Sequence, residues 1–232
     1  MSVKNNNNSH KNIGGSSMNG YFITLEGVEG SGKSTQVKLI REYLESLGYE
    51  VVTTFEPGDT EVGKDIRRIL LSPDNTELVS RAELLLYVAE RAQHVFQLVR
   101  PSLEEGKIVV SDRYTDATLA YQGYARGLNQ KLIEELNCIA TEGLEPDLTL
   151  LLDIDPQISL QRAKQVTAES NDKGDRIEAE KTSFHQRVRK GYLDLANRKE
   201  RIELIDAKQS IDSIFNSIKI ILQKRLIKDE NR

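Results

Sequence analysis

The chain has 232 residues, of which 38% are hydrophobic, and its formal net charge is −4, from 32 Lys and Arg against 36 Asp and Glu. This size suits one α/β domain with a sizeable core, and the acidic balance argues against a protein that binds polymeric nucleic acid over its surface. No apolar run approaches membrane length, and a single cysteine has no partner within the chain, so a cytoplasmic protein without a membrane segment is expected.

The first 17 residues carry four consecutive asparagines and almost nothing apolar. Such a segment cannot bury enough surface to offset its ordering entropy, so it is expected to be disordered. It resembles an expression tag, and the alternative of a functional disordered arm is weaker because only Lys4 and Lys11 are charged. We therefore expect Met18 to be a plausible native start and residues 18–232 to form a single domain.

A β-rich run, Tyr21–Leu25, breaks into a glycine-rich octet that fits G-x-x-x-x-G-K-[ST] at every fixed position. The octet comprises Gly27, Val28, Glu29, Gly30, Ser31, Gly32, Lys33 and Ser34, and Thr35 follows it. The glycines let backbone N–H groups approach phosphate oxygens, Lys33 can reach the β- and γ-phosphates, and the Ser34 hydroxyl can bind Mg²⁺. An ordinary strand-to-helix turn would need neither the lysine nor the hydroxyl. The octet therefore predicts a binding site for a nucleoside triphosphate.

Strands alternate with helices along the rest of the chain, which is typical of a parallel sheet covered on both faces. The further strands are expected at Tyr49–Phe55, Lys107–Ser111, Leu148–Ile154 and Ile202–Ile205. The helices are expected at Gln36–Leu47 with Gly48 as its stop, Val62–Leu71, Thr76–Leu98, Asn129–Ala140, Pro156–Val166, Thr182–Asn197, and a last one with Ile211, Ile214, Phe215, Ile218 and Leu222 on one face. Cys138, between Leu136 and Ile139, is expected to be a small packing residue.

A second chemical site is predicted at Asp112 and Arg113, at the carboxyl end of the third strand. Ligands of open parallel sheets gather at that edge, so this charged pair is expected to face the glycine-rich loop. Asp112 could hold Mg²⁺ through water, and Arg113 could grip the phosphate of an acceptor with two hydrogen bonds. The alternative is a simple salt bridge at the end of a strand.

Four segments together resemble the thymidylate kinase family, in its bacterial type. They are residues 29–35 (EGSGKST), 86–94 (LYVAERAQH), 112–114 (DRY) and 120–123 (AYQG). The resemblance extends from Met18 to the end of the chain. It implies a P-loop nucleoside monophosphate kinase fold, with a five-stranded parallel sheet in the order 2-3-1-4-5 and helices on both faces. It also implies ATP-dependent transfer to dTMP, a requirement for Mg²⁺, and commonly a homodimer.

The same resemblance assigns the acceptor site. Tyr87, usually Phe in the family, falls on the aromatic that stacks on thymine, and Arg91 falls on the arginine that reads the base. Arg113 is implied to bind the acceptor phosphate, and Glu29 to approach the sugar 3′-hydroxyl. The nucleoside is implied to be bordered by Thr118, Tyr121 and Gln122. Independently of the family, the i, i+4 spacing of Tyr87 and Arg91 puts a ring and a cation on one helix face.

The polar segment Thr167–Arg176 predicts a mobile lid, around residues 165–178, because phosphoryl transfer needs charge neutralisation and exclusion of water. Arg176 matches the family motif Asp-Arg-Ile/Phe-Glu, which implies a catalytic lid arginine. Gly30 stands where eukaryotic-type members carry an arginine, so the lid type is expected. The weaker candidates are Arg162, Lys164 and Lys173.

Two positions depart from the family pattern. Phe55 and Asp59 interrupt the usual Thr-Arg-Glu-Pro-Gly-Gly, so the acceptor phosphate has one cation fewer unless Arg67 or Lys64 compensates. Ala117 stands where Ser is usual, with Thr118 next to it. Two other functions stay open from the residues alone: a kinase for another nucleoside monophosphate, and a P-loop GTPase or ATP-driven switch. A GTPase would need Asn-Lys-x-Asp to read guanine, and the sequence has no such motif.

Overall fold

The computed structural model of the chain describes residues 20–170 and 175–229. Five strands form one sheet in the order β2-β3-β1-β4-β5, and every neighbouring pair is parallel. They are β1 (Tyr21–Glu26), β2 (Val51–Phe55), β3 (Ile108–Asp112), β4 (Leu148–Asp153) and β5 (Ile202–Asp206). The sheet expected from the sequence is therefore confirmed, including its strand order. The expected leader, residues 1–17, lies outside the described residues.

The helices are α1 (Lys33–Ser46), α2 (Glu61–Leu71), α3 (Ser80–His94), α4 (Arg100–Glu104), α5 (Thr115–Thr118), α6 (Gln130–Thr141), α7 (Pro156–Ser170), α8 (Thr182–Arg198) and α9 (Ile211–Asp229), with π-helical segments η1 (Val95–Val99) and η2 (Leu119–Ala125). One expected helix, Thr76–Leu98, instead begins at Ser80 and continues through η1 and α4. Pro101, in the first turn of α4, does not end it, and the π-helical segment η1 directly precedes this turn.

Two further expectations from the sequence were wrong in part. Thr167–Ser170, expected to be loop, belongs to α7, since Ala168 and Glu169 are good helix formers and no Gly or Pro interrupts them. Cys138, expected to be a packing residue, is exposed, because α6 buries the face that carries Ile133, Asn137 and Ala140.

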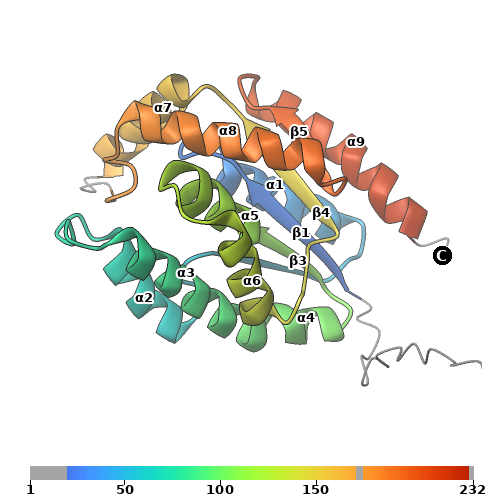
Figure 1. Cartoon of the computed structure of the whole chain (residues 1–232). Helices are drawn as coiled ribbons and strands as arrows, with labels where there is room; N and C mark the ends of the chain where they lie inside the picture. Colours follow the sequence, from blue (N-terminus) through green and yellow to red (C-terminus); the bar gives the residue numbers. More distant parts are fainter. Residues whose placement is uncertain (1–19, 171–174, 230–232) are drawn as a thin grey trace, which may run out of the picture.

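Side chains of β1 alternate between the two faces of the sheet, as the period of a strand requires. Ile23 and Leu25 belong to the large core cluster that also contains α1 residues, whereas Phe22 packs with η1 and α4 and lies edge-on to Tyr114. Figure 1 shows α1 behind the sheet and α5, α6 and α8 in front of it. The same alternation places Glu26, at the end of β1, on the Phe22 side, toward α8.

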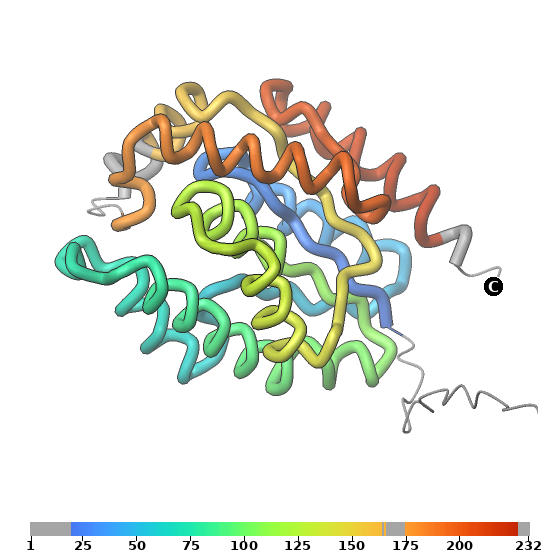
Figure 2. The backbone as a smooth tube through the Cα atoms, viewed as in Figure 1, coloured from blue at the N-terminus to red at the C-terminus, as the bar shows by residue number. Residues whose placement is uncertain are grey.

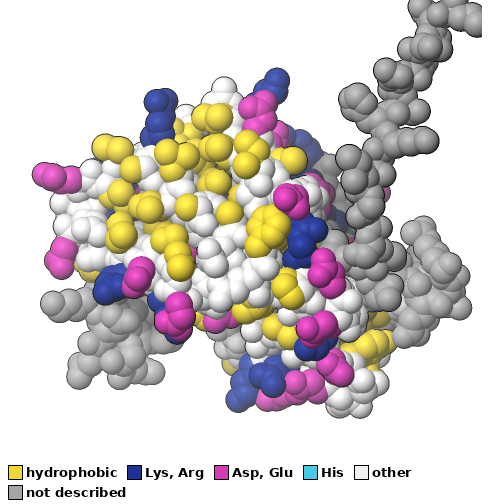
Figure 3. Space-filling view, turned by 90° about the horizontal axis from the view of Figure 1, so that it is seen from below, with side chains coloured by type: hydrophobic (Ala, Val, Ile, Leu, Met, Phe, Trp, Pro, Cys, Tyr) yellow, Lys and Arg dark blue, Asp and Glu magenta, His cyan; other side chains and the backbone are white. Residues whose placement is uncertain are grey.

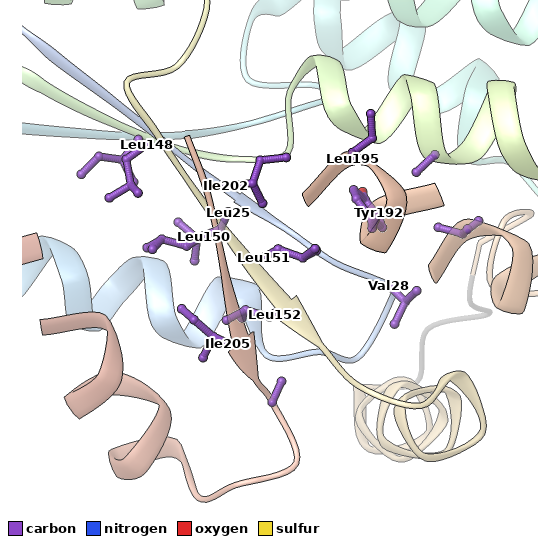
Figure 4. Close-up of a cluster of buried hydrophobic side chains, with 14 of the residues drawn as sticks. Leu25, Val28, Leu148, Leu150, Leu151, Leu152, Tyr192, Leu195, Ile202 and Ile205 are labelled. Carbon is purple, nitrogen blue, oxygen red and sulfur yellow. The ribbon is translucent and has the colours of Figure 1, made fainter. Parts of the chain in front are cut away.

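The interior strand β4 is buried along almost its whole length, as expected for a strand with helices on both faces. Figure 4 shows Leu150 and Leu152 on the side of α1 and α9, and Tyr192 and Leu195 of α8 on the other side. None of the helices within the described ranges is long and apolar enough to cross a membrane.

Candidate active site

A cavity of about 620 Å³ opens where β1, β2 and β3 end. Its walls come from the glycine-rich loop, the loop after β2, and helices α2, α3, α5 and η2, together with residues 175–178. Figure 2 shows how segments far apart in the sequence approach one another on this side of the sheet. The residues of the predicted site that line it are Glu29, Gly30, Lys33, Ser34, Tyr87, Arg91, Asp112, Arg113, Thr118, Tyr121 and Gln122.

The glycine-rich loop adopts backbone angles that favour glycine. Gly27, Gly30 and Gly32 all have positive φ, of 144°, 70° and 92°. A Cβ on Gly30 would overlap the carbonyl oxygen of Ser159, so no arginine fits there without moving α7. At Gly32, by contrast, a Cβ would meet nothing within 4 Å, which leaves open space where α1 begins. The backbone N–H groups of such a glycine-rich turn, followed by an open helix N-terminus, suit a bound phosphate.

Lys33 is the first residue of α1 and is only 8% exposed. Its Nζ donates to the carbonyl oxygens of Gly27, at 3.2 Å, and Val28, at 3.1 Å. Burial lowers the pKa of the Lys33 ammonium, and the nearby Arg113 lowers it further. The ammonium is therefore held by weak partners, the carbonyl oxygens of its own loop, which phosphate oxygens can replace.

Ser34 and Asp112 meet across the cavity floor, with the Ser34 hydroxyl donating to Asp112 Oδ2 at 3.0 Å. A hydroxyl and a carboxylate are the hard oxygen ligands that Mg²⁺ prefers, so this pair fits a Mg²⁺ ion that also binds nucleotide phosphates. Among the residues that the structure describes, no three His, Cys, Asp or Glu side chains gather into a metal site. A site completed by phosphates and water does not need such a cluster.

Arg113 occupies the centre of the cavity wall, with its guanidinium 5.0 Å from the ring of Tyr121. Nη1 donates to Gly27 O at 3.1 Å and to Tyr192 Oη at 3.3 Å, and Nη2 donates to Glu29 Oε1 at 2.8 Å. These bonds engage three of the five guanidinium hydrogens. Within the described ranges, no hydrogen bond uses Nε–H or the second Nη2 hydrogen, and these two can receive a bidentate anion.

Glu29 connects the glycine-rich loop to this arginine. Its Oε1 also accepts from Tyr121 Oη at 2.7 Å, and its Oε2 lies 3.3 Å from Nδ1 of the buried His185. Burial alone would raise the pKa of the Glu29 carboxyl, but Arg113 and the neighbouring donors outweigh this and hold that pKa well below its usual range. Glu29 is therefore an ionised acceptor at the cavity edge.

Arg91 lies at the cavity wall but is saturated by protein partners. It donates to Glu56 Oε2 at 2.9 Å, Thr118 Oγ1 at 2.8 Å, Asn137 Oδ1 at 2.7 Å and the Tyr114 carbonyl at 3.0 Å. Its Nη2 also lies 2.7 Å from Glu56 Oε2. To contact a base directly, Arg91 would have to share or exchange one of these partners. Its expected base-reading role stays a prediction.

The saturation of Arg91 gives Thr118 a defined orientation. Because Thr118 Oγ1 accepts from Arg91, its own hydroxyl hydrogen is free to donate into the cavity. Gln122 is also buried against the cavity and donates from Nε2 to Glu83 at 2.8 Å. Tyr87 lines the same part of the wall. The predicted nucleoside-binding side chains therefore lie together, although they come from α3, α5 and η2.

A buried ionic network supports the loop after β2. The Thr54 hydroxyl donates to Asp59 Oδ2 and lies 2.7 Å from His94 Nε2, while His94 Nδ1 lies 2.9 Å from Glu56 Oε1. Since the only hydroxyl hydrogen of Thr54 goes to Asp59, both ring nitrogens of His94 must donate, and the ring is an imidazolium. Burial alone would lower the pKa of His94, but Glu56 outweighs it and raises that pKa.

The departure from the family pattern at Phe55 and Asp59 lies at this loop. Phe55 is 40% exposed, and the Arg67 guanidinium lies 5.5 Å from its ring centroid while donating to Pro57 O at 2.6 Å. Arg67 lines the cavity, whereas Lys64 does not and pairs with the exposed Glu61. Of the two cations that could compensate for the missing arginine, only Arg67 is in place to do so.

Arg176 does not line the cavity. It donates from Nη2 to Glu83 at 2.6 Å and from Nε to the Leu70 carbonyl at 3.1 Å. Arg162 donates to the Ala207 carbonyl at 3.0 Å. Lys173 lies outside the described residues, and the side chain of Lys164 is not described. The predicted contact of a lid cation with the transferring phosphate therefore stays a prediction.

The sequence analysis missed three buried groups beside the cavity: Glu26, Tyr192 and His185. The last two lie seven residues apart on the buried face of α8, between Phe184 and Leu195. A histidine and a tyrosine on the apolar face of a helix were the available signal, but their partners are on β1 and the glycine-rich loop, far away in the sequence.

Comparison with known proteins agrees with this geometry. The family model described as thymidylate kinase matches residues 25–218. The thymidylate kinase of Maridesulfovibrio salexigens is 49% identical over 208 residues, covering 88% of this chain and 96% of that protein. That of Syntrophotalea carbinolica is 50% identical over 200 residues, covering 85% of this chain and 93% of that protein.

Among solved structures, the crystal structure of thymidylate kinase from Ehrlichia chaffeensis matches with a TM-score of 0.70 and 34% identity, over 88% of this chain and 98% of that chain. The family match covers most of the chain, and it includes the glycine-rich loop and the Asp112–Arg113 pair. The chain therefore belongs to the thymidylate kinase family.

Proposed function

We propose that this protein transfers the γ-phosphoryl group of ATP to dTMP, giving ADP and dTDP for the synthesis of dTTP. The observation that carries the proposal is that Lys33 of the triphosphate loop and Arg113, with a free pair of donors, face the same cavity. A switch protein that only binds and hydrolyses a triphosphate needs no second site for a phosphate. A phosphotransferase with a phosphate acceptor does.

On the donor side, the loop amides and Lys33 bind the triphosphate. Ser34 and Asp112 would hold a Mg²⁺ ion, which would neutralise charge on the phosphates. An oxygen of the dTMP phosphate attacks the γ-phosphorus while the bond to the β,γ-bridging oxygen breaks, and ADP leaves with that oxygen. The protein contributes positioning and positive charge, because this reaction requires little covalent participation by side chains.

On the acceptor side, Arg113 receives the dTMP phosphate through Nε and Nη2, and Arg67 supplies the second cation from the stacked position on Phe55. Tyr87 covers the face of the base. Thr118 presents a hydroxyl donor, which suits a carbonyl oxygen of thymine. Tyr121 and the ionised Glu29 border the sugar, where Glu29 can accept from the 3′-hydroxyl.

The test is a coupled assay of ADP release with purified protein, ATP and each nucleoside monophosphate in turn. We expect dTMP to give a kcat/KM at least tenfold above those of dCMP, dGMP and AMP. A preference for another monophosphate would support the alternative nucleotide kinase. Triphosphate hydrolysis that is independent of every monophosphate would support the switch.

We also propose a cytoplasmic homodimer, paired through the face formed by α2, α3, η1 and α6. Exposed apolar side chains recur there, and a seven-residue spacing puts the pair on α2 and the pair on α6 each on one side of its helix. They are Val62, Ile69, Leu85, Phe96, Leu132 and Ile139, exposed by 43% to 73%. Figure 3, which views the molecule from this side, shows hydrophobic side chains gathered on the surface. Light scattering should give a dimer for the wild type and a monomer for Leu85→Glu.

A further inference from the structure

Arg113 has a backbone conformation that few residues with a side chain adopt. Its φ of 76° lies in the left-handed region, which costs a non-glycine residue on the order of 1 kcal/mol. Arg113 N donates to Leu25 O at 2.9 Å, and Ser111 Oγ donates to Arg113 O at 2.8 Å. Tyr114 N, directly after Arg113, donates to Glu26 Oε1 at 2.9 Å. The turn is therefore fixed from both sides of the residue.

The other oxygen of Glu26 acts on the far end of the same side chain. Tyr192 Oη donates to Glu26 Oε2 at 2.7 Å, and Arg113 Nη1 donates to Tyr192 Oη at 3.3 Å. Glu26 is fully buried and Tyr192 is 2% exposed, so solvent does not compete for the hydrogen bonds between them. One buried carboxyl group thus contacts the backbone after Arg113 and, through one tyrosine, the guanidinium.

This arrangement decides which guanidinium hydrogens stay available. With Nη1 engaged by Gly27 O and Tyr192, and one Nη2 hydrogen by Glu29, no described residue accepts from Nε or from the second Nη2 hydrogen. Without the tyrosine hydroxyl, Nη1 keeps only Gly27, and the guanidinium can turn further toward the ionised Glu29. The pair of parallel donors would then no longer be aimed into the cavity.

We propose that Glu26 and Tyr192 are positioning residues that hold Arg113 in the orientation needed to bind the acceptor phosphate, and this proposal rests on the role proposed above for Arg113. Neither residue lines the main cavity. Their effect is therefore expected only on the part of acceptor binding that comes from the phosphate.

Two variants separate this role from a structural one. Tyr192→Phe keeps the buried ring and removes the hydroxyl. Glu26→Gln keeps an oxygen for Tyr114 N, but its amide group donates to Tyr192 Oη instead of accepting from it, in competition with Arg113. Tyr124→Phe is the matched control, because it removes a hydroxyl that binds Asp194 and Arg198 of α8, away from the cavity.

The measurement is calorimetric binding of dTMP and of thymidine, which lacks the phosphate, to the full chain. We expect the ratio of the thymidine Kd to the dTMP Kd to fall about tenfold in Tyr192→Phe and Glu26→Gln, the loss typical of a displaced charge-assisted hydrogen bond. The Kd for thymidine should stay within twofold of the wild type. Tyr124→Phe should leave both values unchanged.

Arg113→Ala distinguishes the two ways in which this can fail. If Arg113→Ala lowers the ratio and the two positioning variants do not, the positioning role is overturned while the proposed role of Arg113 stands. If the variants weaken thymidine and dTMP equally, the contacts are structural and the proposal is also overturned. If Arg113→Ala leaves the ratio unchanged, Arg113 does not bind the acceptor phosphate, and both proposals fall together.

Discussion

Arg176 Nη2 lies 2.6 Å from Glu83 Oε2, and the carboxylate that receives this bond is fully buried. Arg126 and Gln122 donate to the same carboxylate. Burial alone would raise the pKa of Glu83, but these donors outweigh burial and lower that pKa. Arg176 thus ties residues 175–178 to α3. The contact of Arg176 with the transferring phosphate, which the family resemblance implies, stays a prediction.

The first prediction follows from that contact. Arg176→Ala should lower the free energy of unfolding by about 1–3 kcal/mol, because a buried carboxylate loses a charged donor. Urea denaturation measures this, and kcat measured alongside tests the catalytic role that the family resemblance implies for Arg176. A kcat lower by about 10²-fold with unchanged stability would contradict the anchoring role and support a catalytic lid arginine.

The second prediction concerns the donor site. Lys33→Ala should lower kcat by about 10²–10³-fold, since it removes a preorganised positive charge from the transferring phosphate. Its thermal unfolding should match that of the wild type, because among the described residues the Lys33 ammonium hydrogen-bonds only to the carbonyl oxygens of its own loop. The exposed Lys38 on the same helix supplies the control, and Lys38→Ala should be fully active. Near-normal turnover of Lys33→Ala would rule out the proposed donor site.

The third prediction concerns recognition of the base. Arg91→Ala should raise the KM for dTMP by about tenfold or more and change the KM for ATP little, because it releases Thr118 from its fixed orientation. It should also lower the free energy of unfolding by about 3–5 kcal/mol, since the buried Glu56 carboxylate loses its arginine partner. Thr118→Val supplies the less disruptive comparison and should reproduce the KM effect alone. Equal effects on both substrates would mean that Arg91 only supports the fold.

The fourth prediction uses the pH dependence of stability. Burial, and then the neighbouring Glu56, raise the pKa of Glu90 from 4.5 to about 7, and one of its oxygens accepts from Gly58 N at 2.8 Å. Between these two pKa values the folded chain keeps a proton that the unfolded chain has lost. The contribution of Glu90 is therefore fully present below about pH 4.5 and is lost as the pH rises through about 7.

Glu90→Gln removes this titration and keeps an acceptor for Gly58. The difference between the two pKa values corresponds to about 3 kcal/mol. Between pH 4.5 and pH 8, the free energy of unfolding of the wild type should therefore fall by up to about 3 kcal/mol relative to that of Glu90→Gln. Urea denaturation measures both. A stability gap that does not change with pH would show that Glu90 ionises normally.

Most of the fold could be predicted from the sequence because its signals are local. The run Tyr21–Leu25 and the buried stretch Leu148–Ile154 carry the β-rich pattern of central strands, and both form strands at those places. The loop from Gly27 to Ser34 could be recognised because its function resides in consecutive residues. The ends of elements were less certain, as the extension of α7 to Ser170 shows, since a polar helix end carries no apolar period.

What only the tertiary structure decided is which groups the charged side chains contact. Arg91, Arg113 and Arg176 are three similar side chains in the sequence. Within the part of the chain that the structure describes, the first is saturated by Glu56 and its neighbours, the second keeps two unused donors, and the third is bound to Glu83. The partners of each lie on other elements, tens of residues away. The sequence by itself determined that cations would surround a triphosphate loop, whereas the packing of α3, α5 and α8 around the sheet determined which of them remains free to bind a phosphate.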